Sequence, residues 1–282
     1  DAIVIDLNTP GGGLLPTLQI CYEIKNNAPP NTVAWIHPHA FSAGTIIALS
    51  CREIIVAPNS TFGDAAPVTP MGPIPATERA KIESPILAEV VDSARRNHYD
   101  ERLVEAFVSV GIELWLLQNT ESNESICVNK SEYETIFGKS PPQNFSPIGG
   151  STEGVPTISP FFDTIAKLGQ IETENSPEPW DPKFAQQLPS SRPILSAEDS
   201  TNWVLIRQIV PNDRLLTLKP AEAALYGLVD GVVSGDAALK NWFGARDIQR
   251  YDVNWSEKLV RILVSWPIRI ILIAIFLVCV FV

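Results

Sequence analysis

The first sixty residues switch repeatedly between apolar runs and helical spacing. Residues 2–7 form an apolar, mainly β-branched run, which predicts a strand buried on both faces. Residues 14–25 repeat apolar side chains at close to helical spacing. Two more apolar runs, at 32–37 and 53–57, predict strands on either side of a small-residue helix at 42–51. This strand–helix–strand–helix–strand order predicts a parallel sheet with right-handed crossovers.

The middle of the chain has a different composition. Ten prolines fall within the 53 residues from 141 to 193. Before them, residues 113–117 and 125–128 are predicted to be strands that flank a polar turn. We interpret residues 111–200 as a long irregular, proline-rich insertion, with little core of its own in the stretch 141–193. Strand and helix patterns return over 201–250, so this part and residues 1–110 are predicted to form one α/β core.

The chain ends in an apolar stretch. Residues 268–282 are apolar apart from Arg269, and counting back to Leu259 gives 24 residues that also include Arg261. A bilayer requires about 20 residues of helix, so we expect residues 259–282 to be the start of a membrane region, a transmembrane helix that the end of the sequence cuts short. The alternative is an amphipathic helix that lies on the membrane or packs on the domain. The two arginines weakly favour a cytoplasmic approach.

Charge and cysteine spacing exclude several classes of site. The 282 residues carry a formal charge of −11, which disfavours nucleic acid as a partner. The four cysteines contain no CxxC pair, so a zinc site or redox dithiol is not expected. His37 and His39 are two residues apart but have no accompanying carboxylate cluster, and we expect neither a metal nor a cofactor.

The candidate chemistry lies at two predicted strand-to-helix turns. Ser42 stands in the string Ala-Phe-Ser-Ala-Gly, where its hydroxyl could act as a nucleophile and the Ala43 N–H could face the same point. Gly11 and Gly12 follow the first strand and could present further N–H groups, with Gly12 favoured as the second oxyanion donor. The alternatives are a helix-capping serine and a plain glycine turn.

A serine nucleophile needs a base, and two kinds of residue could supply it. His37 and His39 precede Ser42 in the chain, but this proximity does not set the orientation of their rings, and His98 lies in a polar stretch. Lys81 opens the helix predicted at 78–97, and a desolvated lysine can deprotonate a serine. The alternative for Lys81 is an ordinary solvated side chain.

Several short motifs, in order, resemble one family. The chain is similar to the ClpP-class membrane serine proteases of the NfeD type, which are relatives of signal peptide peptidase A. Any one motif is weak, but their order is specific, and together they cover about half of the chain. The motifs are Asn-Thr-Pro-Gly-Gly at 8–12, Ala-Phe-Ser-Ala-Gly at 40–44, Ile-Ile-Val-Ala-Pro at 54–58, Ser-Thr-Phe-Gly-Asp-Ala-Ala-Pro-Val at 60–68, and the closing segment 216–231.

The resemblance implies a fold, a mechanism and a setting. It implies a ClpP/crotonase-like α/β fold with βαβ units and a Ser–Lys dyad, in which Ser42 is the nucleophile and Lys81 the general base. Gly12 and Ala43 would be the oxyanion donors. It further implies a protease core at 1–110 and 201–250, a membrane region after it, a homo-oligomer, and a catalytic domain on the extracytoplasmic side of the membrane. The implied substrate is a polypeptide, an apolar segment of a membrane protein.

The chain departs from the family pattern at two places. Asn8 replaces the usual aspartate of the first motif, and residues 111–200 do not follow the family pattern.

Two alternative functions stay open. One is a catalytically inactive scaffold of the same fold that binds a membrane protein partner. The other is a crotonase-like acyl-CoA enzyme, which does not need a serine at position 42 and is rarely followed by a membrane helix.

Overall fold

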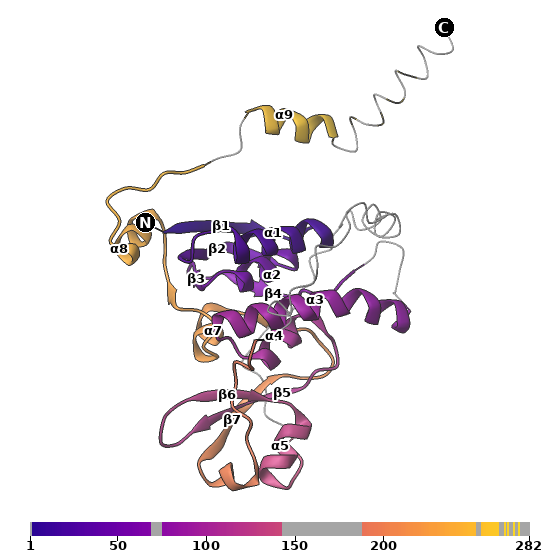
Figure 1. Cartoon of the computed structure of the whole chain (residues 1–282), viewed down its shortest axis with the longest axis vertical. Helices are drawn as coiled ribbons and strands as arrows, with labels where there is room; N and C mark the ends of the chain where they lie inside the picture. The colour runs from indigo at the N-terminus through magenta and orange to yellow at the C-terminus, as the bar shows by residue number, and fades with distance from the viewer. Residues whose placement is uncertain are drawn as a thin grey trace, which may run out of the picture. The chain divides into compact units, whose positions relative to one another are not determined.

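Strand β2 (Thr32–Phe41) is the centre of a six-stranded sheet, seen edge-on in the upper part of Figure 1. β1 (Ile3–Thr9) and β3 (Glu53–Val56) pair with β2 in parallel, and β4 (Thr61–Gly63) pairs in parallel with its last residues. Two short strands complete the sheet, β9 (Gly231–Val232) parallel to β3 and β8 (Thr217–Leu218) antiparallel to β4.

The computed structural model describes residues 2–68, 75–142, 188–251 and 255–264, together with single positions at 268, 270, 273 and 276. Two compact units divide the chain, Asp1–Phe243 and Gly244–Val282, and each is described by itself.

Helices connect the parallel strands as the apolar pattern predicted. α1 (Leu14–Asn26) joins β1 to β2, and α2 (Ala43–Ser50) joins β2 to β3, which confirms the βαβ units and a mixed α/β structure. The burial of β1 differs from the prediction. Only Leu7 of this strand is buried, because β1 pairs with β2 alone among the described strands and lies at an edge of the sheet.

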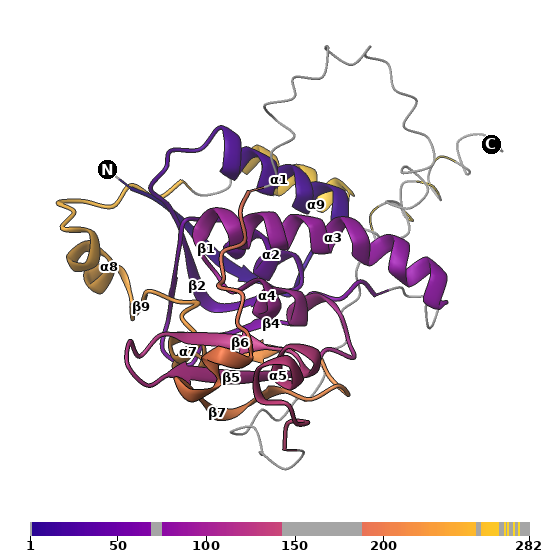
Figure 2. The same ribbon diagram turned by 60° about the horizontal axis from the view of Figure 1, so that its bottom comes forward.

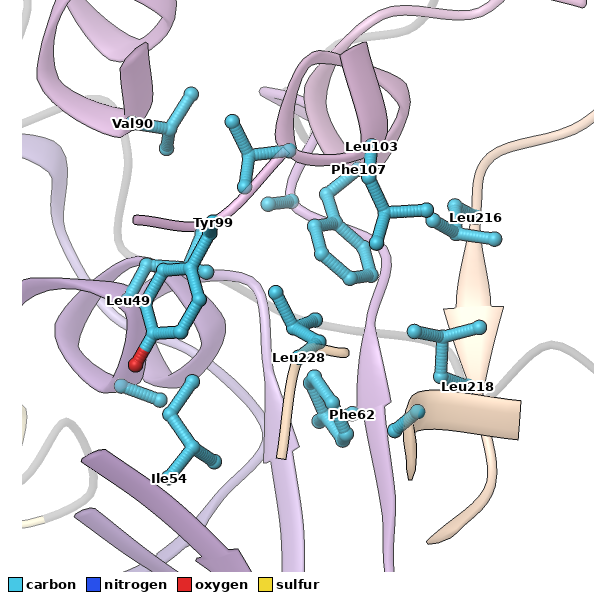
Figure 3. Packing of buried hydrophobic residues seen from close by; sticks show 14 of the residues in the cluster. Leu49, Ile54, Phe62, Val90, Tyr99, Leu103, Phe107, Leu216, Leu218 and Leu228 are labelled. Carbon is cyan, nitrogen blue, oxygen red and sulfur yellow. The ribbon is translucent and has the colours of Figure 1, made fainter. Parts of the chain in front are cut away.

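The main core lies between this sheet and two helices that follow it, α3 (Ala76–Asn97) and α4 (Glu101–Val108). Figure 3 shows side chains from α2, α3, α4 and the short strands meeting in one cluster. Phe62 of β4 and Phe107 of α4 pack with ring centroids 5.9 Å apart. Burying a side chain of this size stabilises the fold by about 1.5–3 kcal/mol, so the cluster fixes α4 against β4.

Residues 111–200 contain the two strands predicted at 113–117 and 125–128, but these belong to a packed sheet and not to an irregular insertion. β5 (Leu114–Asn119) pairs antiparallel with β6 (Ser125–Val128) and with β7 (Trp203–Val210) in a second sheet, lower in Figures 1 and 2. α5 (Lys130–Phe137) and the 3-10 helix η2 (Ala197–Thr201) pack beside it. This sheet has its own buried cluster, comprising Trp115, Leu117, Ile126, Val128, Tyr133, Ile136 and Trp203. Residues 143–187, which contain most of the prolines, lie outside the described residues.

Polar contacts fix the chain where its description resumes at residue 188. Ser190 Oγ and the Ser191 amide both donate to the Glu101 carboxylate, at 2.7 and 2.9 Å. Arg192 donates to Glu132 Oε1 at 2.7 Å, and its side chain is only 11% exposed. Charge-assisted bonds between largely buried groups are the strong class of hydrogen bond. They attach this segment to α4 and α5 although it is 60 to 90 residues away in the chain.

The described residues after β8 include the helices α7 (Pro220–Leu225), α8 (Asp236–Phe243) and α9 (Trp255–Val264). Only α9 overlaps the transmembrane helix expected over 259–282, and most of that range lies outside the described residues. Within the described part of the chain, no helix combines the length and the apolar composition needed to cross a bilayer.

Candidate functional site

Ser42 occupies a strained position between β2 and α2. Its φ of 51° and ψ of −116° lie in a region that residues other than glycine rarely adopt. The backbone holds it there, since the Ser42 N–H lies 3.1 Å from both the Gly63 and Asp64 carbonyl oxygens. Strain of this kind costs about 1–3 kcal/mol and collects at functional sites.

The Ser42 hydroxyl is not a helix cap. It makes no capping hydrogen bond to α2, and no other hydrogen bond joins it to the described residues. The carbonyl of Ser42, by contrast, accepts bonds from the Thr45 and Ile46 amides at 3.0 and 3.2 Å. Ser42 therefore occupies the N-cap position of α2 but does not cap the helix with its side chain, and its hydroxyl is available for another partner.

The glycine loop after β1 lies directly against this turn. Thr9 Oγ1 accepts the Gly11 N–H at 3.1 Å and so shapes the loop. Gly11 has a φ of +133°, and a Cβ there would stand 2.9 Å from Ser42 Cβ and 3.4 Å from Ser42 Oγ. A Cβ on Gly12 would stand 3.5 Å from Ala43 Cβ. The two turns meet because the carboxyl ends of parallel strands lie at the same edge of a sheet.

Thr45 holds the turn between β2 and α2 in place, a role that was not predicted from the sequence. This fully buried hydroxyl lies 2.6 Å from the Ala40 carbonyl oxygen and 3.0 Å from the Gly63 carbonyl oxygen, and it accepts the Gly63 N–H at 2.8 Å. It thus connects α2 to the ends of β2 and β4. The only sequence signal was a hydroxyl residue in the first turn of an otherwise apolar helix.

The segment after β4 forms one wall of the site. The Asp64 N–H donates to the Leu216 carbonyl at 3.0 Å, and the Ala65 N–H donates to the Phe107 carbonyl at 2.7 Å. Partial burial raises the pKa of the Asp64 carboxyl above its ordinary value. This wall is therefore fixed by backbone bonds to α4 and to the residue before β8, and it has an acidic group at its start.

A small pocket opens at the junction of these turns. Its cavity has a volume of about 30 Å³. Ser42 supplies a hydroxyl to it, and most of the other lining side chains are apolar. The lining residues are Gly12, Leu14, Thr17, Ser42, Ala43, Ile46, Ala65, Ala66, Pro67, Val68 and Ile86.

The structure brings together Gly11, Gly12, Ser42 and Ala43 but not Lys81. Lys81 lies on α3 with an exposed side chain, and it does not line the pocket among the described residues. Ile86, which does line the pocket, is five residues further along the same helix and about 140° around it. In this arrangement Lys81 points away from the pocket side of α3.

The histidines occupy other places. His37 stacks on Trp35 with ring centroids 4.4 Å apart, and its Nδ1 lies 3.9 Å from Asp6 Oδ1. His39 stacks on Phe41. Across the described residues, no group of three or more His, Cys, Asp or Glu side chains could hold a metal ion.

Comparison with known proteins identifies the part of the chain that carries this site. Residues 1–136 match the family model described as the NfeD1b N-terminal domain. This segment is of the NfeD type. The match confirms the resemblance seen in the sequence motifs, and it includes Ser42, Lys81 and the glycine loop.

Two solved structures are also similar to part of the chain. Both are the membrane-bound stomatin-specific protease 1510-N, one a lysine-to-alanine mutant in complex with a substrate peptide and the other a serine-to-alanine mutant. Each is 27% identical, covers 38% of this chain and has a TM-score of 0.34. The chain spans about half of their length, 51% and 54%. No curated protein matches the chain.

Replacing Gly11 with alanine tests the contact between the two turns. The new Cβ would stand 2.9 Å from Ser42 Cβ at a φ of +133°, so we expect a loss of about 1–3 kcal/mol in unfolding free energy. We also expect the Ser42 hydroxyl to react at least about tenfold more slowly with a fluorophosphonate, because the turn must shift.

Gly111→Ala is the matched control for this variant. Gly111 also has a positive φ, 95°, but its Cβ would meet nothing within 4 Å. It should lose stability through backbone strain and keep its labelling rate. Equal labelling rates in the two variants would contradict the close approach of the glycine loop to Ser42.

Proposed function

We propose that the chain is a membrane-anchored serine endopeptidase with a ClpP/crotonase-like fold. The observation that carries the proposal is Ser42, a serine held in a strained conformation beside a pocket with its hydroxyl free of any capping bond. A sharp strand-to-helix turn is an efficient way to expose a nucleophilic oxygen. The NfeD-type match over residues 1–136 supports the same assignment.

Two backbone amides are suited to hold the oxyanion. Ala43 is the first residue of α2, so its N–H precedes the first intrahelical bonds and has the positive end of the helix dipole behind it. Gly12 lines the pocket from the opposite loop. In our proposal these two N–H groups stabilise the negative oxygen that forms when Ser42 Oγ attacks a peptide carbonyl.

Lys81 is the proposed general base. Its neutral amine would accept the Ser42 proton as the hydroxyl oxygen attacks, and would then return the proton to the departing amine. A water molecule would hydrolyse the acyl-enzyme by the same route and release Ser42. For this chemistry the first turns of α3 must bring Lys81 toward the pocket when substrate binds or subunits assemble.

Pro85 gives α3 a place to bend. A proline inside a helix cannot donate to the carbonyl four residues earlier, and here that carbonyl belongs to Lys81. Its ring also crowds the same carbonyl, and prolines are the commonest cause of helix kinks. The segment that carries Lys81 is thus joined to Ile86 and the rest of the helix by fewer hydrogen bonds than an ordinary helix has.

Pro85→Ala is expected to lower kcat about tenfold while peptide binding changes little, because the restored hydrogen bond would hold Lys81 in its exposed position. Ser84→Ala is the matched control, since Ser84 is exposed on the same helix and its replacement restores no backbone bond. Steady-state kinetics on a fluorogenic peptide measures both variants. Unchanged or higher kcat in Pro85→Ala would contradict the bending of α3.

The proposed substrate is a polypeptide, an apolar segment of a membrane protein. The lining of the pocket supports this, since Leu14, Ile46, Val68 and Ile86 surround the Ser42 hydroxyl with apolar groups. We further propose that the chain works as a homo-oligomer, with its catalytic domain outside the cytoplasm.

A catalytically inactive scaffold that binds a membrane protein partner is the second candidate. The exposed position of Lys81 favours it, because a serine without a base is a poor nucleophile.

Peptide cleavage separates the two functions. The purified chain in detergent micelles is incubated with unstructured apolar peptides, cleavage is followed by mass spectrometry, and binding is titrated in parallel. The peptidase proposal predicts cleavage by the wild-type chain and binding without cleavage by Ser42→Ala. Binding without cleavage by both proteins would support the scaffold.

A further inference from the structure

Helix α9 has four large apolar residues on one side, an apolar strip with Ser256 among them. Trp255, Leu259, Val260 and Leu263 are 76%, 47%, 56% and 47% exposed. Successive helical residues turn by about 100°, so these four positions fall within an arc of about 140° on one side of the helix. Four large apolar side chains on one exposed face require a covering partner.

The charged residues of α9 fall on the other side. By the same helical geometry, Glu257, Lys258 and Arg261 occupy an arc that does not overlap the apolar strip. The helix is therefore strongly amphipathic, with two of its three charges positive. This pattern is typical of a helix that lies along a membrane surface, with cations at the headgroups and an aromatic ring at the boundary.

The chain that follows α9 indicates the same partner. α9 ends at Val264, and Pro267 follows in the sequence, where a continuous helix would lose a hydrogen bond. Beyond it, residues 268–282 are apolar except for Arg269, and the described side chains of Ile270, Ile273 and Phe276 are exposed. An apolar segment directly after an amphipathic helix is suited to lipid and not to a protein surface.

We propose that α9 lies flat in the interface of a lipid bilayer and does not belong to a membrane-crossing helix. Its apolar strip would sit among the upper acyl chains, with the opposite side of the helix toward the headgroups. A membrane-crossing part could then begin only after Pro267, and not at Leu259. This inference does not depend on Ser42 or on catalysis.

The depth of Trp255 in a bilayer tests the proposal. The full chain is reconstituted into phosphatidylcholine vesicles with phosphatidylglycerol, and bromine on the acyl chains quenches tryptophan fluorescence. Subtracting the signal of Trp255→Phe isolates Trp255. Bromine close to the headgroup should quench Trp255 about twofold more than bromine at the bilayer centre. Equal or stronger quenching from the centre, or none from either, would overturn the proposal.

A charged variant tests the apolar strip itself. Leu259→Glu with Leu263→Glu should reduce the quenching of Trp255 by at least about half, since two carboxylates oppose burial of the strip. Ile20→Glu with Tyr22→Glu introduces the same charge at exposed apolar positions of α1 and should leave the quenching unchanged. Unaltered quenching in the α9 variant would also overturn the proposal. These fluorescence readouts are independent of peptide cleavage, so either proposal can fail alone.

Discussion

Ser42→Ala is expected to lower peptide hydrolysis by at least about 10³-fold while peptide binding stays within about twofold. The expected loss is large because the hydroxyl oxygen of Ser42 is the atom that forms the acyl-enzyme. In the proposed mechanism no neighbouring group replaces it. Binding should persist, because the pocket lining and the amides of Gly12 and Ala43 remain in place. Steady-state kinetics and a binding titration with the same peptide separate the two effects.

Ser60→Ala is the matched control for this loss. Ser60 is fully buried, and its hydroxyl has no hydrogen-bond partner among the described residues. Removing an unsatisfied hydroxyl is close to neutral for stability, so this variant should keep wild-type activity. Activity that survives in Ser42→Ala, or that disappears equally in both variants, would contradict the role of Ser42.

Lys81→Ala is expected to lower kcat by about 10²–10⁴-fold, the range contributed by a positioned general base. Lys81→Arg should not restore activity, because a guanidinium stays protonated and cannot accept the Ser42 proton. Lys130→Ala, which removes an exposed lysine from α5, should behave like the wild-type chain.

Lys81 is exposed in the structure, so its substitution tests whether it acts as the base. If Lys81→Ala keeps its activity while Ser42→Ala loses it, the base is another group and the bending of α3 at Pro85 has no catalytic role. If both substitutions abolish cleavage and spare binding, the two residues act together in a state that differs from the present arrangement.

The parts predicted well from sequence are those that depend on neighbouring residues. Apolar periods located β1, α1, β2, α2 and β3, and the order of these elements required a parallel sheet. In such a sheet the turns after successive strands meet at one edge, so the proximity of Gly11 and Ser42 followed from the same pattern. The strained backbone of Ser42 was not predicted from the sequence and is seen only in the structure.

The parts that sequence reasoning missed depend on contacts between distant residues. Local patterns predicted the strands at 113–117 and 125–128, but not their assembly into a second sheet, in which β5 and β7 pair across more than 80 residues. Arg192 binds Glu132, 60 residues earlier, and no local pattern marks such a pair. The side of α3 that Lys81 faces likewise depends on how the whole helix packs, which the spacing between Ser42 and Lys81 does not encode.

The most direct measurement is the site of covalent labelling by a fluorophosphonate. The full chain in detergent micelles is treated with the probe, digested, and mapped by mass spectrometry, with Ser42→Ala and Ser60→Ala alongside. We expect one adduct, on the peptide that contains Ser42, present in Ser60→Ala and absent from Ser42→Ala. An adduct on another residue, or a wild-type chain that stays unlabelled while it cleaves peptide, would contradict this expectation.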